Sequence, residues 1–451
     1  MKEAGAVLLV ACYEMGHQPL AVASPAAFLQ QAGYTPATMD LSVEPFDVEK
    51  VARARLVAIS VPMHTALRLG VRVAARVRSV NAGAHICLYG LYAALNADYL
   101  LAHGADSAIG AEAEPQLVAL AHRLAHPSSP PAPAATGRLR FVTPSRAALP
   151  ALKEYAQLDH DGRRQLVAYV ESSRGCKHLC RHCPIPPVYG GRFVVVPEDV
   201  VLADVRQQVA AGATHVSFGD PDFLNGPGHA LRLARALHAE FPGVTFDFTA
   251  KVEHLLRERA RLPELAALGC LFVVTAAESL DDTVLAHLDK GHTRAGIEQV
   301  LALTRAAGIA LRPTWVAFTP WTTLDGYRTW LAFIALHGLV DAVDPVQYSV
   351  RLLVPPGSLL ADHPAMRPHL GALVPEDFYF RWAHPDARMD RLQTAVSRTV
   401  AEAAARDEDA AVTFDRVRAL ADEAAGAARA PALTLPPDRR RAPRLTEPWF
   451  C

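Results

Sequence analysis

Three cysteines stand within eight residues of one another, in the arrangement C-x3-C-x2-C formed by Cys176, Cys180 and Cys183. The other four cysteines are scattered, so the odd total of seven is a poor disulfide framework and a good source of metal ligands. Three thiolates fall one short of the shell of a structural zinc ion, which Cys270 or a histidine within the motif would complete. The alternative is a cuboidal iron–sulfur cluster, which four cysteines normally hold, so that three leave one iron open to a substrate or cosubstrate.

Charge and hydropathy exclude several classes of protein. The chain of 451 residues has 45 Lys and Arg against 46 Asp and Glu, which does not favour a binder of nucleic acid or anionic membranes. No apolar run approaches the roughly 18 residues of a membrane span. The run 4–11 before Cys12 resembles a short lipoprotein signal, but Glu3 and Glu14 flank it, and a first β-strand is the preferred interpretation. We therefore expect a cytoplasmic protein with neither nucleic acid nor membrane as a partner.

The elements that position the cysteines fall into two α/β series. The first 126 residues alternate apolar runs with helical patterns, which predicts a doubly wound domain with a parallel sheet. Any ligand of such a domain lies beyond the carboxyl ends of its strands, near residues 13–19, 62–65 and 90–92. The expected strands are 6–11, 37–41, 56–61, 85–89 and 106–110, and the expected helices are 25–32, 65–80, 95–102 and 115–124.

A linker over residues 127–165 opens with the Pro- and Ala-rich stretch PSSPPAPAATGR and leads to the second series. Six β/α units over residues 166–355 predict a full or partial parallel barrel, with the cysteines soon after its first strand. Residues 356–428 are expected to be a helical region, and residues 429–451 an extended tail that ends in Cys451. The expected barrel strands are 166–170, 215–219, 245–249, 271–275, 311–318 and 346–353.

The cysteine segment ESSRGCKHLCRHC, residues 171–183, resembles the signature loop of the radical S-adenosylmethionine (SAM) superfamily. That family carries the loop after the first strand of a partial (β/α)6 barrel, and His182 stands where it usually has an aromatic residue. The resemblance implies that the three cysteines hold a [4Fe-4S] cluster whose open iron chelates SAM. It also implies reductive cleavage of SAM with electrons from a donor such as flavodoxin or ferredoxin.

Other barrel positions are similar to the same family. Gly219 and Asp220 end the second strand where the family has a Gly-Gly-Glu-like element that contacts the amino group of SAM, the alternative being a plain turn. Glu278 ends the fourth strand where the family places an acid beside the ribose hydroxyls, the alternative being an ordinary loop acid. Arg312, in the fifth strand, is suited to a cofactor carboxylate or to pairing with an internal acid.

The N-terminal series resembles the cobalamin-binding domain that precedes many radical SAM barrels, above all in residues 88–95 and 104–114. The axial-ligand pattern Asp-x-His-x-x-Gly is absent, because His17 lies in the segment EMGHQP. Some members of the family bind cobalamin without an axial histidine. The sequence therefore leaves cobalamin open and slightly disfavours it.

The end of the chain, LTEPWFC, adds a candidate catalytic residue in Cys451. Trp449 and Phe450 favour burial, so the tail is expected to fold over the barrel mouth, the alternative being a disordered end. The whole chain resembles radical SAM proteins with a CUAEP or CCAEP tail, in which a second cysteine or a selenocysteine follows. We expect that an in-frame UGA was read as a stop or that the tail is naturally shorter.

This family is similar to the enzymes of arsinothricin biosynthesis, which transfer the 3-amino-3-carboxypropyl group of SAM to trivalent arsenic. Soft thiolates favour soft metalloid centres, so Cys451 is expected to hold arsenite as the substrate. The alternatives are cobalamin-dependent methylation and hydrogen abstraction from a small molecule by a 5′-deoxyadenosyl radical. A zinc-stabilised binding protein without chemistry is the alternative from another class.

Overall fold

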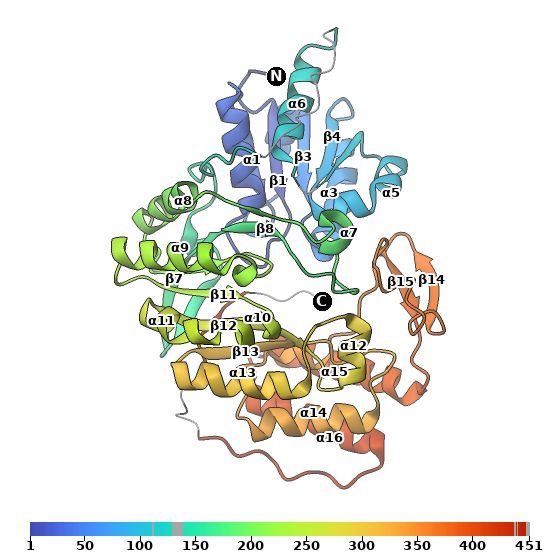
Figure 1. Ribbon diagram of the computed structural model, residues 1–451. Helices are drawn as coiled ribbons and strands as arrows, with labels where there is room; N and C mark the ends of the chain where they lie inside the picture. Colours follow the sequence, from blue (N-terminus) through green and yellow to red (C-terminus); the bar gives the residue numbers. More distant parts are fainter. Residues whose placement is uncertain (111, 129–138, 437–438, 440, 448–451) are drawn as a thin grey trace.

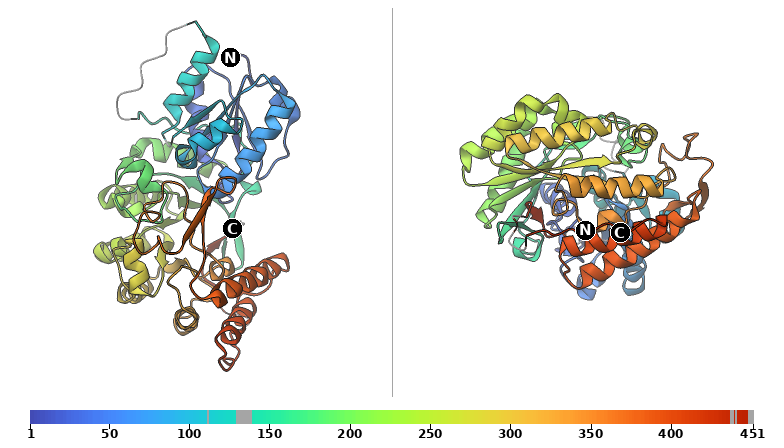
Figure 2. Two further views of the ribbon diagram at one scale, coloured as in Figure 1. Left: turned by 90° about the vertical axis from the view of Figure 1, so that its right-hand side faces the viewer. Right: turned by 90° about the horizontal axis from the view of Figure 1, so that it is seen from below.

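The computed structural model describes residues 1–110, 112–128, 139–436, 439 and 441–447. Two α/β domains lie one above the other (Figure 1), with a pair of helices at the lower end of the molecule (Figure 2, left). The predicted class, a doubly wound domain followed by a partial barrel, is confirmed. Cys451 and most of the Pro- and Ala-rich stretch, residues 129–138, lie outside the described residues. No helix within the described ranges is both long enough and apolar enough to cross a membrane.

The N-terminal domain is built on a five-stranded parallel sheet in the order β2-β1-β3-β4-β5. Its central strand β1 (Val7–Ala11) is buried along its whole length. Leu8 and Val10 pack in the core beneath α3, whereas Val7 and Leu9 pack in the core beneath α1 and α6. Because helices cover both faces, the strand is a continuous apolar run in the sequence. The remaining elements are α1 (Leu20–Gln31), β2 (Ala37–Asp40), α2 (Val48–Arg53), β3 (Leu56–Ser60), α3 (His64–Val80), β4 (His85–Tyr89), α4 (Leu91–Leu95), α5 (Ala97–Ala102), β5 (Ser107–Ile109) and α6 (Glu114–Ala125).

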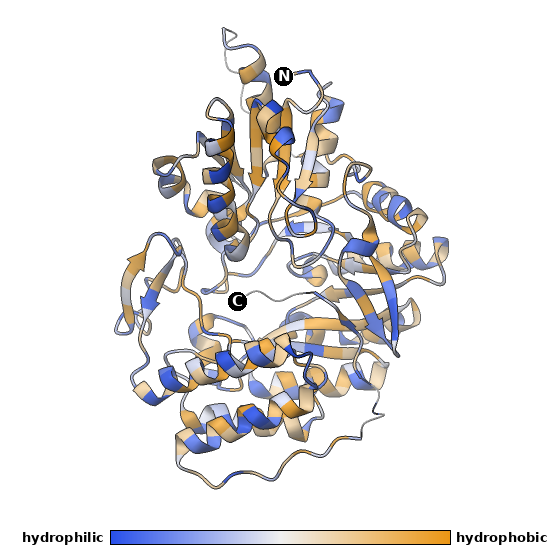
Figure 3. Ribbon diagram, turned by 180° about the vertical axis from the view of Figure 1, so that it is seen from behind, coloured by the Kyte–Doolittle hydropathy of each residue, from blue (hydrophilic) through white to orange (hydrophobic). Residues whose placement is uncertain are grey.

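The second sheet has the order β13-β12-β11-β10-β7-β6-β16 and curls into a half-barrel. Strands β7 and β10 to β13 are parallel, and helices α8 to α11, α13 and α14 cover their outer face. The helices alternate polar and apolar residues, whereas the strands are mainly apolar (Figure 3). The bounds are β6 (Gln157–His160), β7 (Arg163–Val170), α8 (Glu198–Ala210), β10 (His215–Phe218), α9 (Pro227–Glu240), β11 (Thr245–Thr249), α10 (Val252–Arg257), α11 (Leu262–Ala267), β12 (Cys270–Glu278), α12 (Asp282–Leu288), α13 (Arg294–Ala307), β13 (Ala310–Trp315) and α14 (Leu324–Leu336), with short 3-10 helices at η1 (Leu152–Glu154), η2 (Phe223–Asn225) and η3 (Arg259–Arg261).

The expected sixth barrel strand, residues 346–353, was wrong. This segment begins as the 3-10 helix η4 (Pro345–Tyr348) and meets the sheet only through an isolated bridge between Phe318 and Arg351. The backbone N–H of Trp315, at the end of β13, donates to the side-chain Oε1 of Gln347 at 2.9 Å. A side chain therefore accepts the hydrogen bond that the backbone of a sixth strand would have taken.

Two other expectations need correction. The sheet begins inside the predicted linker, because β6 and β7 form a hairpin whose turn, Asp161-Gly162, has positive φ at both residues, as hairpin turns require. The predicted helical region 356–428 also starts with an antiparallel hairpin, β14 (Leu370–Val374) and β15 (Tyr379–Trp382). Two helices follow it and pack against each other, α15 (Ala387–Ala405) and α16 (Ala410–Ala425).

The described part of the tail runs extended along the lower side of the molecule, and its strand then pairs with the β6 edge of the half-barrel (Figure 1). Strand β16 (Arg444–Leu445) pairs antiparallel with β6, and Thr446 exchanges hydrogen bonds with the backbone of Gln157. Leu445 packs on the small apolar cluster formed by Leu158, Val167 and Phe272. Leu445 therefore contributes to the barrel interior.

Candidate cofactor site

The three cysteines lie in a closed loop after β7, residues 171–192, here called the cysteine loop. Strand β8 (Ser173–Gly175) pairs antiparallel with β9 (Phe193–Val195) and closes the loop at its base, and helix α7 (Ile185–Tyr189) lies inside it. Cys180 is buried, and Cys176 and Cys183 are partly buried. The hairpin presents all three thiols from one short segment above the half-barrel.

Gly175 permits this closure. Its φ is +77°, and a Cβ there would lie 2.5 Å from the carbonyl oxygen of Arg192 and 2.6 Å from the ring of Tyr189. We expect Gly175→Ala to destabilise the fold by about 1–3 kcal/mol and to lower the iron bound per chain, since the base of the loop must open. Denaturant unfolding and iron analysis measure both effects. Gly190→Ala is the matched control, because Gly190 also has positive φ but no atom within 4 Å of its Cβ position; equal losses in both variants would contradict this account.

Asp220 ties the start of the cysteine loop to the end of β10. Its carboxylate accepts hydrogen bonds from the backbone N–H of Ser172 at 2.8 Å and from the hydroxyls of Ser172 and Ser173. Burial raises the pKa of Asp220 to about 6, although these hydrogen bonds oppose the shift. Gly219 leaves room for Tyr169, whose ring atoms lie as close as 2.2 Å to the position of a Cβ. The structure thus brings both predicted residues to the loop, where Asp220 supports the backbone.

Glu278 also meets the cysteine loop, from the end of β12. It accepts a hydrogen bond from Nζ of Lys290 at 3.1 Å, and its Oε1 lies 3.2 Å from Nε2 of His182, the residue before Cys183. Burial alone would raise the pKa of Glu278, but the Lys290 ammonium and His182 outweigh burial and hold the pKa well below its usual range. The side chain is therefore an ionised acceptor beside the thiols.

The donor set fits an iron–sulfur cluster better than a single zinc ion. Two thiolates on a tetrahedral zinc ion lie about 3.8 Å apart. Among the described residues, the sulfur atoms of the three cysteines do not all lie within 4.8 Å of one another. The ligand atoms of His178, Asp222 and His254 do lie that close together. Cys270 begins β12 and Glu278 ends it, so Cys270 lies a whole strand, roughly 26 Å, from the loop.

Unpartnered groups around the loop support the same interpretation. Burial raises the pKa of the Cys183 thiol to about 12, so its thiolate requires a cation such as iron. Among the described side chains, Nδ2 of Asn225 and Nδ1 of His182 are buried without a hydrogen-bond partner. Both are available to a bound group beside the cysteines.

Arg312 lies apart from the cysteine loop, within the barrel. Its Nη2 donates to both carboxylate oxygens of Asp344 at 2.8 Å, and its Nη1 donates to the carbonyl of Pro443 in the tail. Arg312 therefore pairs with an internal acid, which was one of the two alternatives. A role for Arg312 in binding a cofactor carboxylate stays a prediction.

The N-terminal domain packs directly on the cysteine loop. Helix α4 lies against α7, and Tyr92 of α4 is buried close enough to Cys183 for the thiolate charge to raise its pKa further than burial alone does. His17, in the loop after β1, stacks on Tyr169 of β7 with ring centroids 4.2 Å apart. Glu447 of the tail lies 3.8 Å from the same histidine. The loops that would face a cobalamin thus contact the barrel and the tail.

Docking of the tail is expected to depend on pH through Glu447. Burial, with the charges of Asp344 and Asp247, raises the pKa of Glu447 from 4.5 to about 8 despite Arg312. A carboxyl whose pKa is raised on docking binds more protons when docked, so docking is strongest below pH 4.5 and weakens as pH rises through about 8. Tryptic cleavage after Arg444 should therefore accelerate between pH 6 and pH 9 by more than the pH response of trypsin itself. We expect this excess to be on the order of tenfold. Glu447→Gln should remove this excess; an unchanged excess would show that another group controls docking.

A cavity of about 210 Å³ lies behind Glu278, and sequence patterns gave no sign of it. Trp315, Trp330 and Tyr327 line it together with the N-terminal end of α14. The indole N–H groups of both tryptophans have no hydrogen-bond partner among the described residues. The cavity is smaller than the roughly 300 Å³ of a typical small-molecule pocket, so it suits part of a ligand.

The part of the chain that carries these features matches a known family model. Residues 170–318 match the family model described as the radical SAM superfamily, and this stretch contains the three cysteines, Gly219, Asp220 and Glu278. In the curated proteins the chain is 26% identical over 246 residues to a tRNA-2-methylthio-N(6)-dimethylallyladenosine synthase of Geobacter sulfurreducens. The match covers 52% of this chain and 50% of that protein, so the chain spans about half the length of this relative.

Two solved structures are similar to most of the chain. The cobalamin-dependent SAM radical enzyme OxsB, with aqua-cobalamin and SAM bound, is similar over 86% of this chain and 66% of that chain, with a TM-score of 0.65 and 13% identity. The radical SAM methyltransferase TsrM from Kitasatospora setae, with cobalamin and a [4Fe-4S] cluster bound, is similar over 73% of this chain and 70% of that chain, with a TM-score of 0.55 and 18% identity. At these identities the likeness is one of fold.

Proposed function

We propose that this chain is an enzyme that transfers the 3-amino-3-carboxypropyl group of SAM to trivalent arsenic. The observation that carries the proposal is the closed loop that presents three thiols, and no fourth, beside the ionised Glu278. In this reaction the C–S bond to the transferred group breaks, methylthioadenosine leaves and the resulting carbon radical forms a carbon–arsenic bond. The adduct would return one electron to the oxidised cluster and release a proton, so arsenic goes from the +3 to the +5 state and no net reductant is consumed. A bound [4Fe-4S] cluster would supply the electron for C–S cleavage, received from a donor such as flavodoxin or ferredoxin.

Each part of the site has a task in this proposal. Cys176, Cys180 and Cys183 hold the cluster, and Glu278 is an acceptor for the ribose hydroxyls of SAM. The cavity behind Glu278 receives another part of the cosubstrate. The buried packing of the N-terminal domain on the loop excludes water from these groups.

The tail supports arsenic as the acceptor. Strand β16 fixes the tail in the half-barrel, and Glu447 lies beside His17, between the two domains. Cys451 follows Glu447 by four residues in the sequence and lies outside the described residues. A soft thiol suits a soft, trivalent metalloid.

The second candidate is a cobalamin-dependent methyltransferase, which the fold likeness to OxsB and TsrM favours. Against it, α4 lies on α7, and His17 is occupied by Tyr169 and Glu447. The absorption spectrum after loading with hydroxocobalamin and desalting discriminates the two candidates. Retained corrin absorbance would favour methylation; its absence supports the transfer.

Anaerobic incubation with SAM and reductant, with and without arsenite, tests the transfer directly. We expect methylthioadenosine and an arsenic–carbon product that require arsenite, and their loss in Cys451→Ala. Only 5′-deoxyadenosine, in the presence or absence of arsenite, would contradict arsenic transfer and favour hydrogen abstraction.

A further inference from the structure

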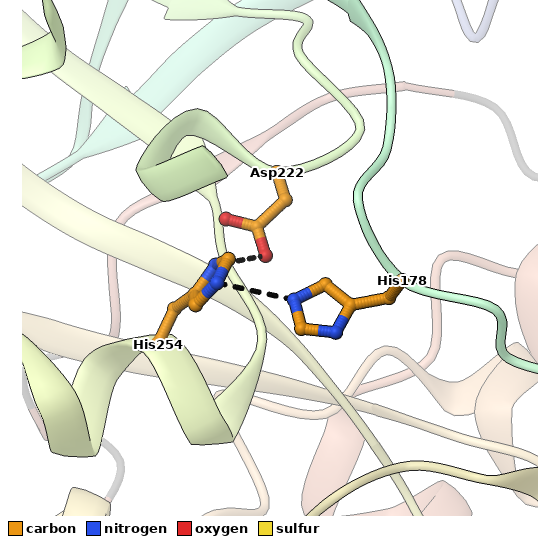
Figure 4. A group of neighbouring side chains, drawn as sticks. All are labelled: His178, Asp222 and His254. Atoms are coloured by element: carbon orange, nitrogen blue, oxygen red, sulfur yellow. Dashed lines mark hydrogen bonds and ion pairs between the residues drawn. The ribbon is translucent and has the colours of Figure 1, made fainter. Parts of the chain in front are cut away.

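Three side chains connect the loop after β10 to the cysteine loop (Figure 4). Oδ2 of Asp222 accepts a hydrogen bond from Nδ1 of His254 at 2.7 Å, and Nε2 of His254 lies 3.1 Å from Nε2 of His178. Asp222 and His254 are 0% and 1% exposed. His178 stands between Cys176 and Cys180 in the sequence, so the chain of contacts ends within the cysteine loop.

The direction of these hydrogen bonds follows from the chemistry of the groups. A carboxylate only accepts, so His254 donates from Nδ1, and its Nε2 is an acceptor when the ring is neutral. His178 then donates from Nε2. Asp222 thereby determines which ring nitrogen of His254 faces His178, and through that contact it orients the His178 ring.

A second contact from the same loop holds the neighbouring residue. Oδ1 of Asn225 accepts the backbone N–H of Lys177 at 3.2 Å, and the thiol of Cys176 lies 3.8 Å from that oxygen. Asn225 is fully buried. The loop after β10 therefore fixes residues 176–178 at two points, which limits the conformations of this part of the cysteine loop.

A metal ion between the three residues suits the arrangement less well. Their ligand atoms all lie within 4.8 Å of one another. However, Oδ2 of Asp222 also accepts the backbone N–H of Lys251, and its Oδ1 accepts that of Leu224. Two ring nitrogens remain, whereas a structural zinc site uses four ligands.

We propose that Asp222 and His254 are positioning residues that act through His178 to set the reduction potential of the cluster held by the three cysteines. The inference rests on the proposed function only in that a cluster binds there. Outer hydrogen bonds orient the ligand shell and tune the potential of iron–sulfur sites. The Asp222 carboxylate supplies a buried negative charge, which disfavours addition of an electron.

The experiment is a redox titration of the reconstituted protein, followed by electron paramagnetic resonance, on Asp222→Asn, His178→Phe and the double variant. Asp222→Asn removes the charge and keeps one acceptor oxygen, which can serve Leu224 or Lys251 but not both. We expect a normal iron content and a midpoint potential shifted to more positive values. In the His178→Phe background we expect the same Asp222→Asn change to shift the potential less, because only the direct action of the Asp222 charge on the loop remains.

Asp247→Asn is the matched control, because Asp247 is also buried against a histidine, His215, but within the barrel strands rather than at the cysteine loop. It should leave the potential unchanged. An unchanged potential in Asp222→Asn, or an equal shift with and without His178, would overturn the proposal. The proposal would also be overturned if the parent protein bound one zinc ion per chain and His254→Phe lost it. If Asp222→Asn does not fold, the titration is made on His178→Gln instead, because His178 is the partly exposed end of the chain of contacts. The proposal then requires that His178→Gln shifts the midpoint potential. Failure of the parent protein to bind iron would instead refute the proposed function.

Discussion

Cys180→Ser is expected to leave a folded chain that binds no [4Fe-4S] cluster and does not cleave SAM. Cys180 is buried within a hairpin whose closure depends on β8, β9 and Gly175, so a serine of similar size should fit. Two thiolates hold too few irons, and the loss should exceed the roughly 10–100-fold typical of outer hydrogen-bond partners. Iron and sulfide analysis with product quantification after anaerobic reconstitution measures this.

The control for that variant is Cys270→Ala. Cys270 is buried at the far end of β12 and its thiol donates to the backbone of Phe272, so it should affect stability without affecting iron content. If Cys270→Ala lost metal as completely as Cys180→Ser, a zinc site with four cysteine ligands would have to be considered again.

Lys290→Met is expected to destabilise the chain by about 3–5 kcal/mol, because it leaves the Glu278 carboxylate buried without its ammonium partner. Urea unfolding measures the change. Glu278 is ionised in the folded state with its pKa held low, so the pair stabilises the fold above the ordinary carboxyl pKa and loses this contribution as pH falls. Raising the pH should therefore not rescue the variant. SAM binding should weaken as well, since Glu278 lies beside the thiols.

The double variant Lys290→Met with Glu278→Gln provides the test of cause. It removes both charges and should recover most of the lost stability without recovering SAM cleavage. A double variant as unstable as the sum of the single ones would show that each residue acts through packing rather than through the pair.

The parallel strands were predictable because the physical signal is local. Strand β1 is apolar throughout since helices cover both faces of its sheet, and β11 was predicted with its observed bounds. The expected strand at residues 346–353, VQYSVRLL, mixes polar with apolar residues, and the Gln347 side chain takes its place at the sheet edge. The apolar residues favoured a strand, but the bond from Trp315 to a side chain is a long-range contact that this pattern does not indicate.

The site was predictable to the extent that chemistry is concentrated in one segment. The spacing of the three cysteines identified the loop, but His254 comes from a distant element and is a single residue without a motif. The Asp-x-x-Asn pattern after β10 was the available signal for that loop. The partner of Arg312 could not be predicted, because a position within a strand does not indicate that Asp344, 32 residues later, pairs with it.

The most direct test of the central claim is anaerobic reconstitution with iron and sulfide, followed by mass spectrometry of SAM incubated with reductant. The account predicts a [4Fe-4S] protein that cleaves SAM to methylthioadenosine with arsenite, and no cleavage by Cys180→Ser. A colourless protein with one bound zinc ion and intact SAM would contradict it.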